Sequence, residues 1–215
     1  MSLYLSRIQL NPLYAPALKL AADPVALHRR ILALLPCRQG SKPRTGLQPR
    51  TADVLFRVDE TDSGPVVLIQ SFEPPDWTRL EVAQRALRQP PETKLFEPAF
   101  RPGQRLAFRL LARPCKRRDG RRWDLRTDEE RLAWLARKAE LAGVKVESVG
   151  LTILSLPAIK GDRPRGQPGS TFAAVRFDGE LLVAEPSRLE AAVRRGIGAQ
   201  KAFGFGLLSL APLRE

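Results

Sequence analysis

The sequence contains few of the residues from which metal centres and disulfide frameworks are built. It has a single histidine, and its two cysteines, Cys37 and Cys115, lie far apart without a CxxC spacing. This count argues against a zinc site and against a disulfide framework. No cluster of carboxylates that would hold a divalent cation is visible either. We therefore expect a protein that needs no metal ion and no cofactor.

Long apolar runs are also missing from the chain. Arg7 interrupts the apolar stretch at the N-terminus, and no signal peptide or transmembrane span is visible. We therefore expect a cytoplasmic protein without a membrane partner. The spacing of the glycines fits neither a dinucleotide-binding motif nor a P-loop. With 215 residues, the chain can form one large domain or two small ones.

Acidic residues are outnumbered, and the imbalance is uneven. Residues 1–100 hold 13 Lys and Arg against 10 Asp and Glu, whereas residues 101–215 hold 23 against 13, so the halves carry +3 and +10 of the net charge of +13. Such a charge points to a polyanionic partner, nucleic acid or an anionic membrane surface, and of these two we expect nucleic acid. The alternative is a generally arginine-rich composition without such a partner.

The periodicity of the first half predicts the order β-α-β-β-α-β. Asp23 as N-cap and Pro24 at the first helical position begin one helix, and Asp76 caps a second. The breaker-rich residues 37–50 are expected to form a loop, and the proline-rich residues 89–102 a linker that could hold a short strand. Strands are expected over residues 4–10, 54–58 and 65–72.

The second half repeats this order. Thr127 with Glu130 makes a capping box that begins a helix. The turn pair Asp178-Gly179 predicts a hairpin within residues 172–183. The remaining elements are strands over residues 105–111, 144–156 and 206–210 and a short helix over residues 187–195.

Each half therefore has the split βαβ order of a ferredoxin-like domain. We predict an α+β protein with two tandem ferredoxin-like (RRM-like, βαββαβ) domains. The first spans residues 1–90, the second spans residues 103–215, and a proline-rich linker covers residues 91–102. This fold by itself says little about chemistry.

His28 is the residue best suited to acid–base chemistry. At about 100° per residue, it lies at the edge of the apolar stripe of its helix. We therefore expect a partly exposed side chain, ordered by packing yet reachable, as a general acid or base requires. Histidine suits RNA cleavage because its pKa lies near 7 and the 2′-hydroxyl is a built-in nucleophile. A merely structural histidine is the alternative.

Two basic segments of the second half could contact phosphates. The first is residues 116–122, for which the alternative to an RNA contact is a solvated loop. The second is residues 159–170, which could order on RNA or be disordered. Their cations are Lys116, Arg117, Arg118, Arg121 and Arg122 in the first segment, and Lys160, Arg163 and Arg165 in the second.

A glycine-rich segment, residues 196–206, follows the last expected helix. Glycines let backbone N–H groups approach a phosphate closely, and a tight turn required by packing is the alternative. The KAFGFG stretch is weakly similar to the RRM aromatic motif, but its flanks do not fit. The segment contains Gly196, Gly198, Lys201, Gly204 and Gly206.

The stretch GIGAQKAFGFGLLSLAP closely resembles the glycine-rich signature of the CRISPR repeat-associated proteins. More narrowly, it resembles the type I-E precursor-crRNA endoribonucleases, the CasE family. Five further segments resemble that family in the same order, so the resemblance covers nearly the whole chain: YLSRIQLNP, PVALHRRIL, EPPDW, PGQRLAFRLLARPCK and EERLAWLARK.

The resemblance implies binding of the stem-loop of the CRISPR repeat and metal-independent cleavage at the 3′ base of the stem. The 2′-hydroxyl attacks and leaves a 2′,3′-cyclic or 3′-phosphate and a 5′-hydroxyl. The enzyme then stays with its product among the other subunits of the type I-E surveillance complex. The family's catalytic histidine falls on His28, its glycine-rich loop on residues 196–206, and its stem-contacting segments on residues 116–122 and 160–165.

Two positions depart from the family pattern. A tyrosine three residues before the histidine is Val25 here, and a lysine five residues after it is Ala33. Arg29, Lys201 or a loop cation could instead stabilise the reacting phosphate. The departures support a second hypothesis, a catalytically weak or inactive subunit that only binds the RNA stem-loop. A third, a general single-stranded RNA binder of RRM type, would need aromatics exposed on a sheet face.

Overall fold

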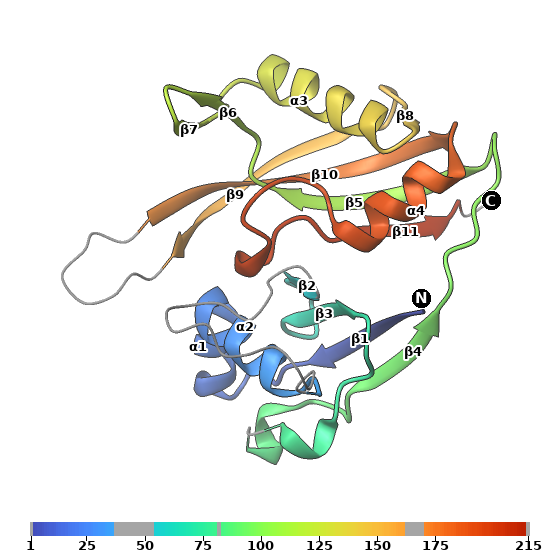
Figure 1. Ribbon diagram of the computed structural model, residues 1–215. Coiled ribbons are helices and arrows are strands. Elements are labelled where there is room, and N and C mark those ends of the chain that lie inside the picture. Colours follow the sequence, from blue (N-terminus) through green and yellow to red (C-terminus); the bar gives the residue numbers. More distant parts are fainter. Residues whose placement is uncertain (1, 37–53, 81–82, 162–169, 214–215) are drawn as a thin grey trace. The chain divides into compact units, whose positions relative to one another are not determined.

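The computed structural model describes residues 2–36, 54–80, 83–161 and 170–213 (Figure 1). The chain divides into two compact units. The first comprises Met1–Glu97 with Lys201–Gly204, and the second comprises Pro98–Gln200 with Phe205–Glu215. Each unit has its own sheet, helices and apolar core.

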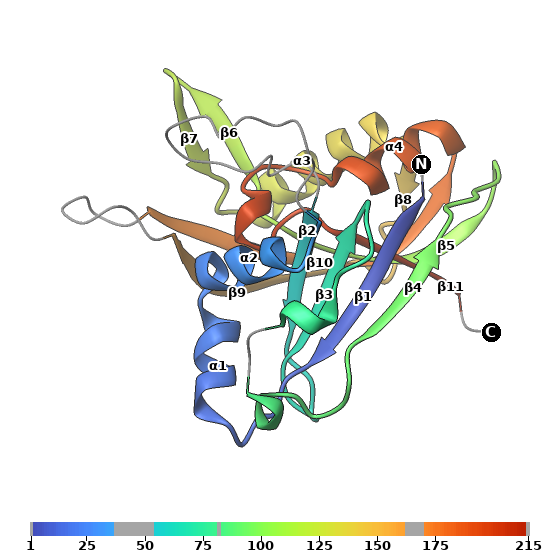
Figure 2. The ribbon, with the colours of Figure 1, turned by 60° about the horizontal axis from the view of Figure 1, so that its bottom comes forward.

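The sheet of the first unit has the strand order β2-β3-β1-β4, with every neighbour antiparallel (Figure 2). This is the strand order of a ferredoxin-like domain, and it places β1 and β3 at the centre. Part of the predicted linker forms β4, which pairs with β1 at the edge of the sheet. The strands are β1 (Leu3–Gln9), β2 (Val54–Asp59), β3 (Val66–Ser71) and β4 (Glu92–Phe96).

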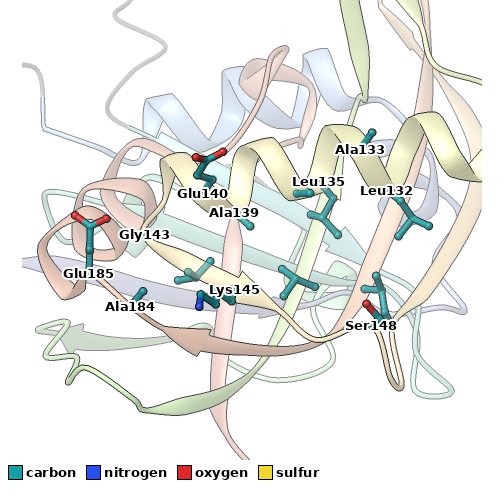
Figure 3. Close-up of a pocket in the computed structure, with 14 residues that line it drawn as sticks. Leu132, Ala133, Leu135, Ala139, Glu140, Gly143, Lys145, Ser148, Ala184 and Glu185 are labelled. Carbon is teal, nitrogen blue, oxygen red and sulfur yellow. The ribbon is translucent and has the colours of Figure 1, made fainter.

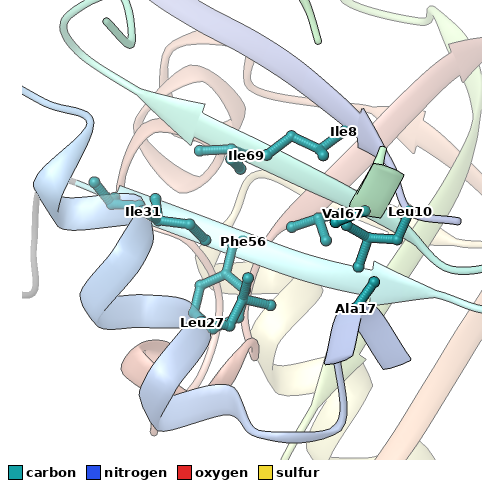
Figure 4. Packing of buried hydrophobic residues seen from close by; sticks show 10 residues of the cluster. Ile8, Leu10, Ala17, Leu27, Ile31, Phe56, Val67 and Ile69 are labelled. Atoms are coloured by element: carbon teal, nitrogen blue, oxygen red, sulfur yellow. The ribbon is translucent and has the colours of Figure 1, made fainter. Parts of the chain in front are cut away.

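Two helices, α1 (Ala15–Ala22) and α2 (Pro24–Ala33), pack on one face of this sheet. The predicted start of α2 is confirmed, because the Asp23 carboxylate accepts hydrogen bonds from the backbone N–H groups of Val25 and Ala26. Sequence periodicity did not identify α1. The core contains Ile8, Leu10, Ala17, Leu27, Ile31, Val54, Phe56, Val67, Ile69 and Ala86 (Figure 4).

The second helix predicted for the first half is wrong. Asp76 does cap a turn, through the backbone N–H of Thr78, but the described residues of this segment form only the short 3-10 turns η1 (Trp77–Arg79) and η2 (Gln84–Ala86). Backbone groups that would continue a helix are used elsewhere. The Ala86 carbonyl accepts from the N–H of Asn11, and the Arg88 N–H donates to the Gln9 carbonyl.

The second unit has the order β11-β5-β10-β8, and β9 also pairs with β10. β8 and β9 occupy successive parts of one edge, so the strand order matches that of the first unit. Together the two sheets confirm the predicted α+β fold class. The elements are β5 (Arg105–Ala112), β8 (Val144–Val146), β9 (Thr152–Gly161), β10 (Ser170–Val183), β11 (Leu208–Pro212), α3 (Asp128–Leu141) and α4 (Pro186–Arg195).

The predicted hairpin at Asp178-Gly179 is also wrong, because β10 runs unbroken through both residues. The Asp178 carboxylate accepts hydrogen bonds from Arg109 on β5 and from Arg176, so a turn-forming residue is held within the sheet. The expected strand over residues 144–156 is instead divided into β8 and β9.

An additional hairpin lies between β5 and α3. Its strands, β6 (Cys115–Arg118) and β7 (Arg121–Asp124), form a separate ribbon beside the beginning of α3 (Figure 1). The predicted N-cap of α3 is confirmed, since the Thr127 hydroxyl accepts from the Glu130 N–H at 3.3 Å, and the Glu130 carboxylate accepts from the N–H of Arg126, one residue before the cap. In the described part of the chain, no helix is both long and apolar enough to cross a membrane.

Candidate active site and nucleic-acid interface

His28 is the one described residue with a buried side-chain polar atom that lacks a hydrogen-bond partner. Its Nε2 is covered, and nothing in the described ranges lies within hydrogen-bonding distance. Only 9% of the residue is exposed, so the predicted partial exposure is wrong in degree. An unsatisfied buried polar atom costs about 1–3 kcal/mol, and native proteins contain few of them. The atom is therefore a candidate for a functional role.

The surroundings of His28 are apolar. Its imidazole stacks on the ring of Phe56 from β2, with centroids 5.9 Å apart and an angle of 22° between the planes. The short turn η3 (Lys201–Phe203) packs against both α2 and β2. Burial lowers the pKa of His28 below its ordinary value, because desolvation disfavours the charged imidazolium. A neutral imidazole keeps one ring nitrogen free to accept a proton.

Two predicted cations share the first unit with His28. Arg29 is exposed on α2, and Lys201 is half-buried on η3. Val25 and Ala33, which replace the expected tyrosine and lysine, are half-buried and exposed respectively on α2. Within the described ranges, no three His, Cys, Asp or Glu side chains gather closely enough to hold a metal ion.

Four predicted RNA contacts are exposed on the basic hairpin, the name used here for β6, β7 and their turn. Arg117 lies opposite Arg122, and Arg118 lies opposite Arg121. Like charges directly opposite on a sheet repel each other, so this ribbon favours an anion between its cations. Asp119 and Gly120 form the turn with φ of 50° and 74°.

The fifth cation of the basic hairpin, Lys116, pairs with Glu130 of α3 at 3.1 Å. The backbone N–H of Arg126 and the Lys116 ammonium together hold the pKa of Glu130 below its usual value. This pair is exposed, so Lys116 can exchange its carboxylate for a phosphate at little cost.

The base of the basic hairpin is anchored by residues that the sequence interpretation missed. Arg113 is buried at the end of β5, forms an ion pair with Asp124, and lies 4.6 Å from the centroid of the Phe172 ring. The other oxygen of Asp124 accepts from the Ala173 N–H at 3.3 Å. The only signal in the sequence for Arg113 was that arginines recur along β5 and directly beyond its end.

The remaining predicted site residues are those of the second basic segment and of the glycine-rich segment. Lys160 is exposed on β9, whereas Arg163 and Arg165 lie outside the described residues. Gly196 ends α4 by donating its N–H to the Ala192 carbonyl.

The rest of the glycine-rich segment is closely packed. A Cβ added to Gly198 would lie 3.4 Å from the Trp134 ring. Gly204 and Gly206 are buried, and the Gly206 N–H donates to the Leu111 carbonyl. At least for Gly204 and Gly206, the structure therefore favours a turn required by packing over a direct contact with phosphate.

A pocket of about 670 Å³ in the second unit is separate from all of these residues (Figure 3). Its lining includes Leu132, Leu135 and Ala139 of α3 and the charged residues Glu140, Lys145 and Glu185. Its lining contains no histidine and no cysteine. The pocket therefore carries none of the acid–base chemistry considered for His28.

Comparison with known proteins assigns the chain to a class. Residues 3–212 match the family described as "CRISPR associated protein", and the chain belongs to this family.

Two curated relatives are similar over most of their length. The CRISPR-associated endoribonuclease Cse3 of Thermus thermophilus is 34% identical over 98% of this chain and 100% of the relative. The Cascade subunit CasE of Escherichia coli is 32% identical over 89% and 93% respectively.

Solved structures agree with this assignment. The T. thermophilus Cse3 structure bound to an RNA representing a pre-cleavage complex has a TM-score of 0.78 at 34% identity, covering 99% of this chain and 100% of that one. The E. coli Cas6e crystal structure has a TM-score of 0.68 at 28% identity, and the match covers 98% of this chain and 100% of that one. The resemblance expected from the sequence motifs is thereby confirmed.

Proposed function

We propose that this protein is an endoribonuclease that binds the stem-loop of CRISPR repeat RNA and cleaves precursor crRNA at the 3′ base of the stem. The observation that carries the proposal is His28. It is the only histidine of the chain, and its covered Nε2 has no hydrogen-bond partner among the described residues. The chain that surrounds it is 34% identical to a CRISPR-associated endoribonuclease along its full length.

In this reaction the neutral His28 Nε2 accepts the proton of the 2′-hydroxyl next to the scissile phosphate. The 2′-oxygen attacks phosphorus, the bond to the 5′-oxygen breaks, and that oxygen takes up a proton from His28 or water. The products are a 2′,3′-cyclic phosphate, or a 3′-phosphate after its hydrolysis, and a 5′-hydroxyl. No metal ion takes part in this scheme. Because Nε2 is covered in the free chain, RNA binding has to move part of its cover aside.

Arg29 and Lys201 are the cations proposed to stabilise charge on the reacting phosphate. Arg29 follows His28 on α2, and Lys201 lies on η3, which packs against α2. A cation at the developing phosphorane lowers the barrier by electrostatic stabilisation, which is most effective where water is excluded. They would take the place of the tyrosine and lysine that are absent at Val25 and Ala33.

We propose that cationic side chains and backbone N–H groups bind the phosphates of the stem-loop. Such contacts to phosphate do not depend on the RNA sequence. In the glycine-rich segment, the outer glycines face the RNA, and the buried Gly204 and Gly206 support the loop's shape. The contacts are Lys116, Arg117, Arg118, Arg121 and Arg122, with Lys160, Arg163, Arg165, Gly196, Gly198 and Lys201.

The protein is further proposed to act in the cytoplasm and to keep its product while joining the other subunits of the type I-E surveillance complex. The E. coli relative is itself a Cascade subunit. A nuclease that retains its product turns over once, so a slow chemical step is tolerated.

Incubation of the purified protein with the repeat RNA of its source genome tests the function. We expect one cut at the 3′ base of the stem, insensitivity to EDTA, and a 5′-hydroxyl on the downstream fragment. A linear RNA of scrambled sequence is the matched control and should remain intact. The competing function is a binding-only subunit, which the substitutions at Val25 and Ala33 favour. Tight stem-loop binding without product at enzyme excess would establish it and exclude the nuclease.

A further inference from the structure

We propose that Phe56 and Gly204 are positioning residues that together hold the His28 imidazole in its working orientation. This inference rests on the proposed function, because it assigns a purpose to residues around the proposed catalytic histidine. Neither residue is expected to touch RNA, since both are buried.

The first observation is the contact between the two rings. The Phe56 and His28 centroids are 5.9 Å apart with nearly parallel planes. Phe56 is only 1% exposed and belongs to the core cluster with Leu27 and Ile31, the buried residues of α2 on either side of His28 (Figure 4). The phenyl ring is therefore fixed by packing, and the imidazole rests on a rigid surface.

The second observation is the close approach of the glycine-rich segment to the same phenyl ring. A Cβ added to Gly204 would lie 3.3 Å from Cε2 and 3.7 Å from Cζ of Phe56. The φ of Gly204 is +86°, a conformation that other residues adopt only with strain. The backbone at Gly204 therefore contacts the ring without a side chain between them, and any larger residue pushes on Phe56.

A third observation shows why stacking matters here. Catalytic histidines are commonly oriented by a hydrogen bond to one ring nitrogen. In a histidine that exchanges protons through Nε2, such a bond is made by Nδ1, so the lack of a partner for Nε2 among the described residues leaves that atom available to react. The flat contact with Phe56 is a further interaction that limits rotation of the imidazole. A shift of about 1 Å in a catalytic group can cost on the order of 100-fold in rate.

The test compares Gly204→Ala with Gly150→Ala. Gly150 has a φ of +74° with open space around the position of a Cβ, so its substitution imposes similar backbone strain without pressing on a ring. We expect Gly204→Ala to lower the single-turnover cleavage rate at saturating RNA by about 10-fold or more. The dissociation constant of the stem-loop should change by a smaller factor than the cleavage rate, and Gly150→Ala should change neither quantity.

Phe56→Leu tests the other member of the pair. Phe56→Leu should lower the single-turnover cleavage rate. In the double variant, Gly204→Ala should lower that rate little further, because both changes act through the Phe56 ring. Ile69→Val is the control for a weakened core, since Ile69 belongs to the same cluster. A rate that falls equally in Ile69→Val and Phe56→Leu would overturn the proposal in favour of general destabilisation.

A readout that is independent of activity comes from the single histidine. The NMR signal of the His28 Cε1 proton is unique in the tag-free protein and is sensitive to the current of a stacked ring. Gly204→Ala and Phe56→Leu should shift it, whereas Gly150→Ala should not. An unchanged signal in Gly204→Ala would refute the pair. A shifted signal in a protein whose wild type cleaves no repeat RNA would instead refute the proposed nuclease and leave the packing arrangement standing.

Discussion

The surroundings of His28 and the basic hairpin are built on opposite principles. His28 is covered and stacked on Phe56, and its Nε2 has no hydrogen-bond partner in the described part of the chain. Arg117, Arg118 and Arg121 are exposed and lie opposite other cations. Proton transfer benefits from an ordered group of tuned pKa, and phosphate capture benefits from solvated charge on a surface. The difference indicates that cleavage and RNA binding can be altered separately.

The two units also differ in the connection that follows the first strand of each sheet. Both have the same antiparallel strand order, but in the first unit β1 leads through a short connection into α1 and α2. In the second unit the corresponding connection, between β5 and α3, contains the basic hairpin. The proposed catalytic residue His28 therefore lies on a core helix of the first unit, and the arginines of the basic hairpin lie on an insertion in the second.

Replacing His28 should give the largest effect and the sharpest separation of cleavage from binding. We expect His28→Ala to reduce the single-turnover rate by at least about 100-fold, since general acid–base catalysis contributes that much or more. Stem-loop affinity, measured by filter binding, should change less than twofold. His28→Gln keeps a polar side chain and should be equally inactive. Substantial cleavage by either purified variant would contradict the role of His28.

Removing exposed arginines from the basic hairpin should have the reverse effect. For Arg118→Ala with Arg121→Ala, stem-loop affinity should fall on the order of 10-fold, and the salt dependence of binding should weaken by about two counterions. The cleavage rate at saturating RNA should stay within twofold of wild type. Arg101→Ala with Arg137→Ala removes the same charge from other exposed positions and is the control. Equal losses in both double variants would mean that net charge, not the hairpin, attracts RNA.

The sequence predicted well those features that depend on neighbours in the chain. The caps at Asp23 and Thr127 formed as expected, because an N-cap needs only the next two or three backbone N–H groups. His28 was proposed because it is the only histidine and was expected at the edge of an apolar helix face, and its catalytic role stays a prediction. The resemblance to the CasE family then supplied the reaction, which no local pattern could have given.

Features decided by distant contacts were mispredicted or missed. Asp178-Gly179 has the composition of a turn, yet Arg109 from another strand keeps Asp178 within β10. The contacts of Phe56 with His28 and Gly204 join segments that are far apart in the sequence, so no spacing could reveal them. Burial of His28 was underestimated because η3, which packs on its helix, comes from the glycine-rich segment.

The anchoring of the basic hairpin can be compared with an exposed ion pair in the same unit. Arg113→Met leaves the Asp124 carboxylate half-buried and removes the cation from the Phe172 ring. We expect it to lower the free energy of unfolding by about 2 kcal/mol, below the cost of about 3–5 kcal/mol for a fully buried pair. Arg105→Met breaks the exposed pair with Glu180 and should cost less than about 1 kcal/mol. Urea unfolding followed by tryptophan fluorescence measures both, and equal costs would show that Arg113 is no anchor.

The smallest expected effect is a shift in pH dependence, and it should appear in cleavage and not in binding. Burial lowers the pKa of His28, so the neutral imidazole persists to lower pH than in an exposed histidine. Cleavage efficiency at sub-saturating RNA reports groups of the free enzyme. Its acidic limb should therefore have a midpoint below the ordinary histidine value of about 6.5, with activity lost as pH falls through that midpoint. Arginines do not titrate in this range, so the dissociation constant of the stem-loop should stay flat between about pH 5.5 and 8. A midpoint above the ordinary histidine value would show that a nearby anion, and not burial, controls His28.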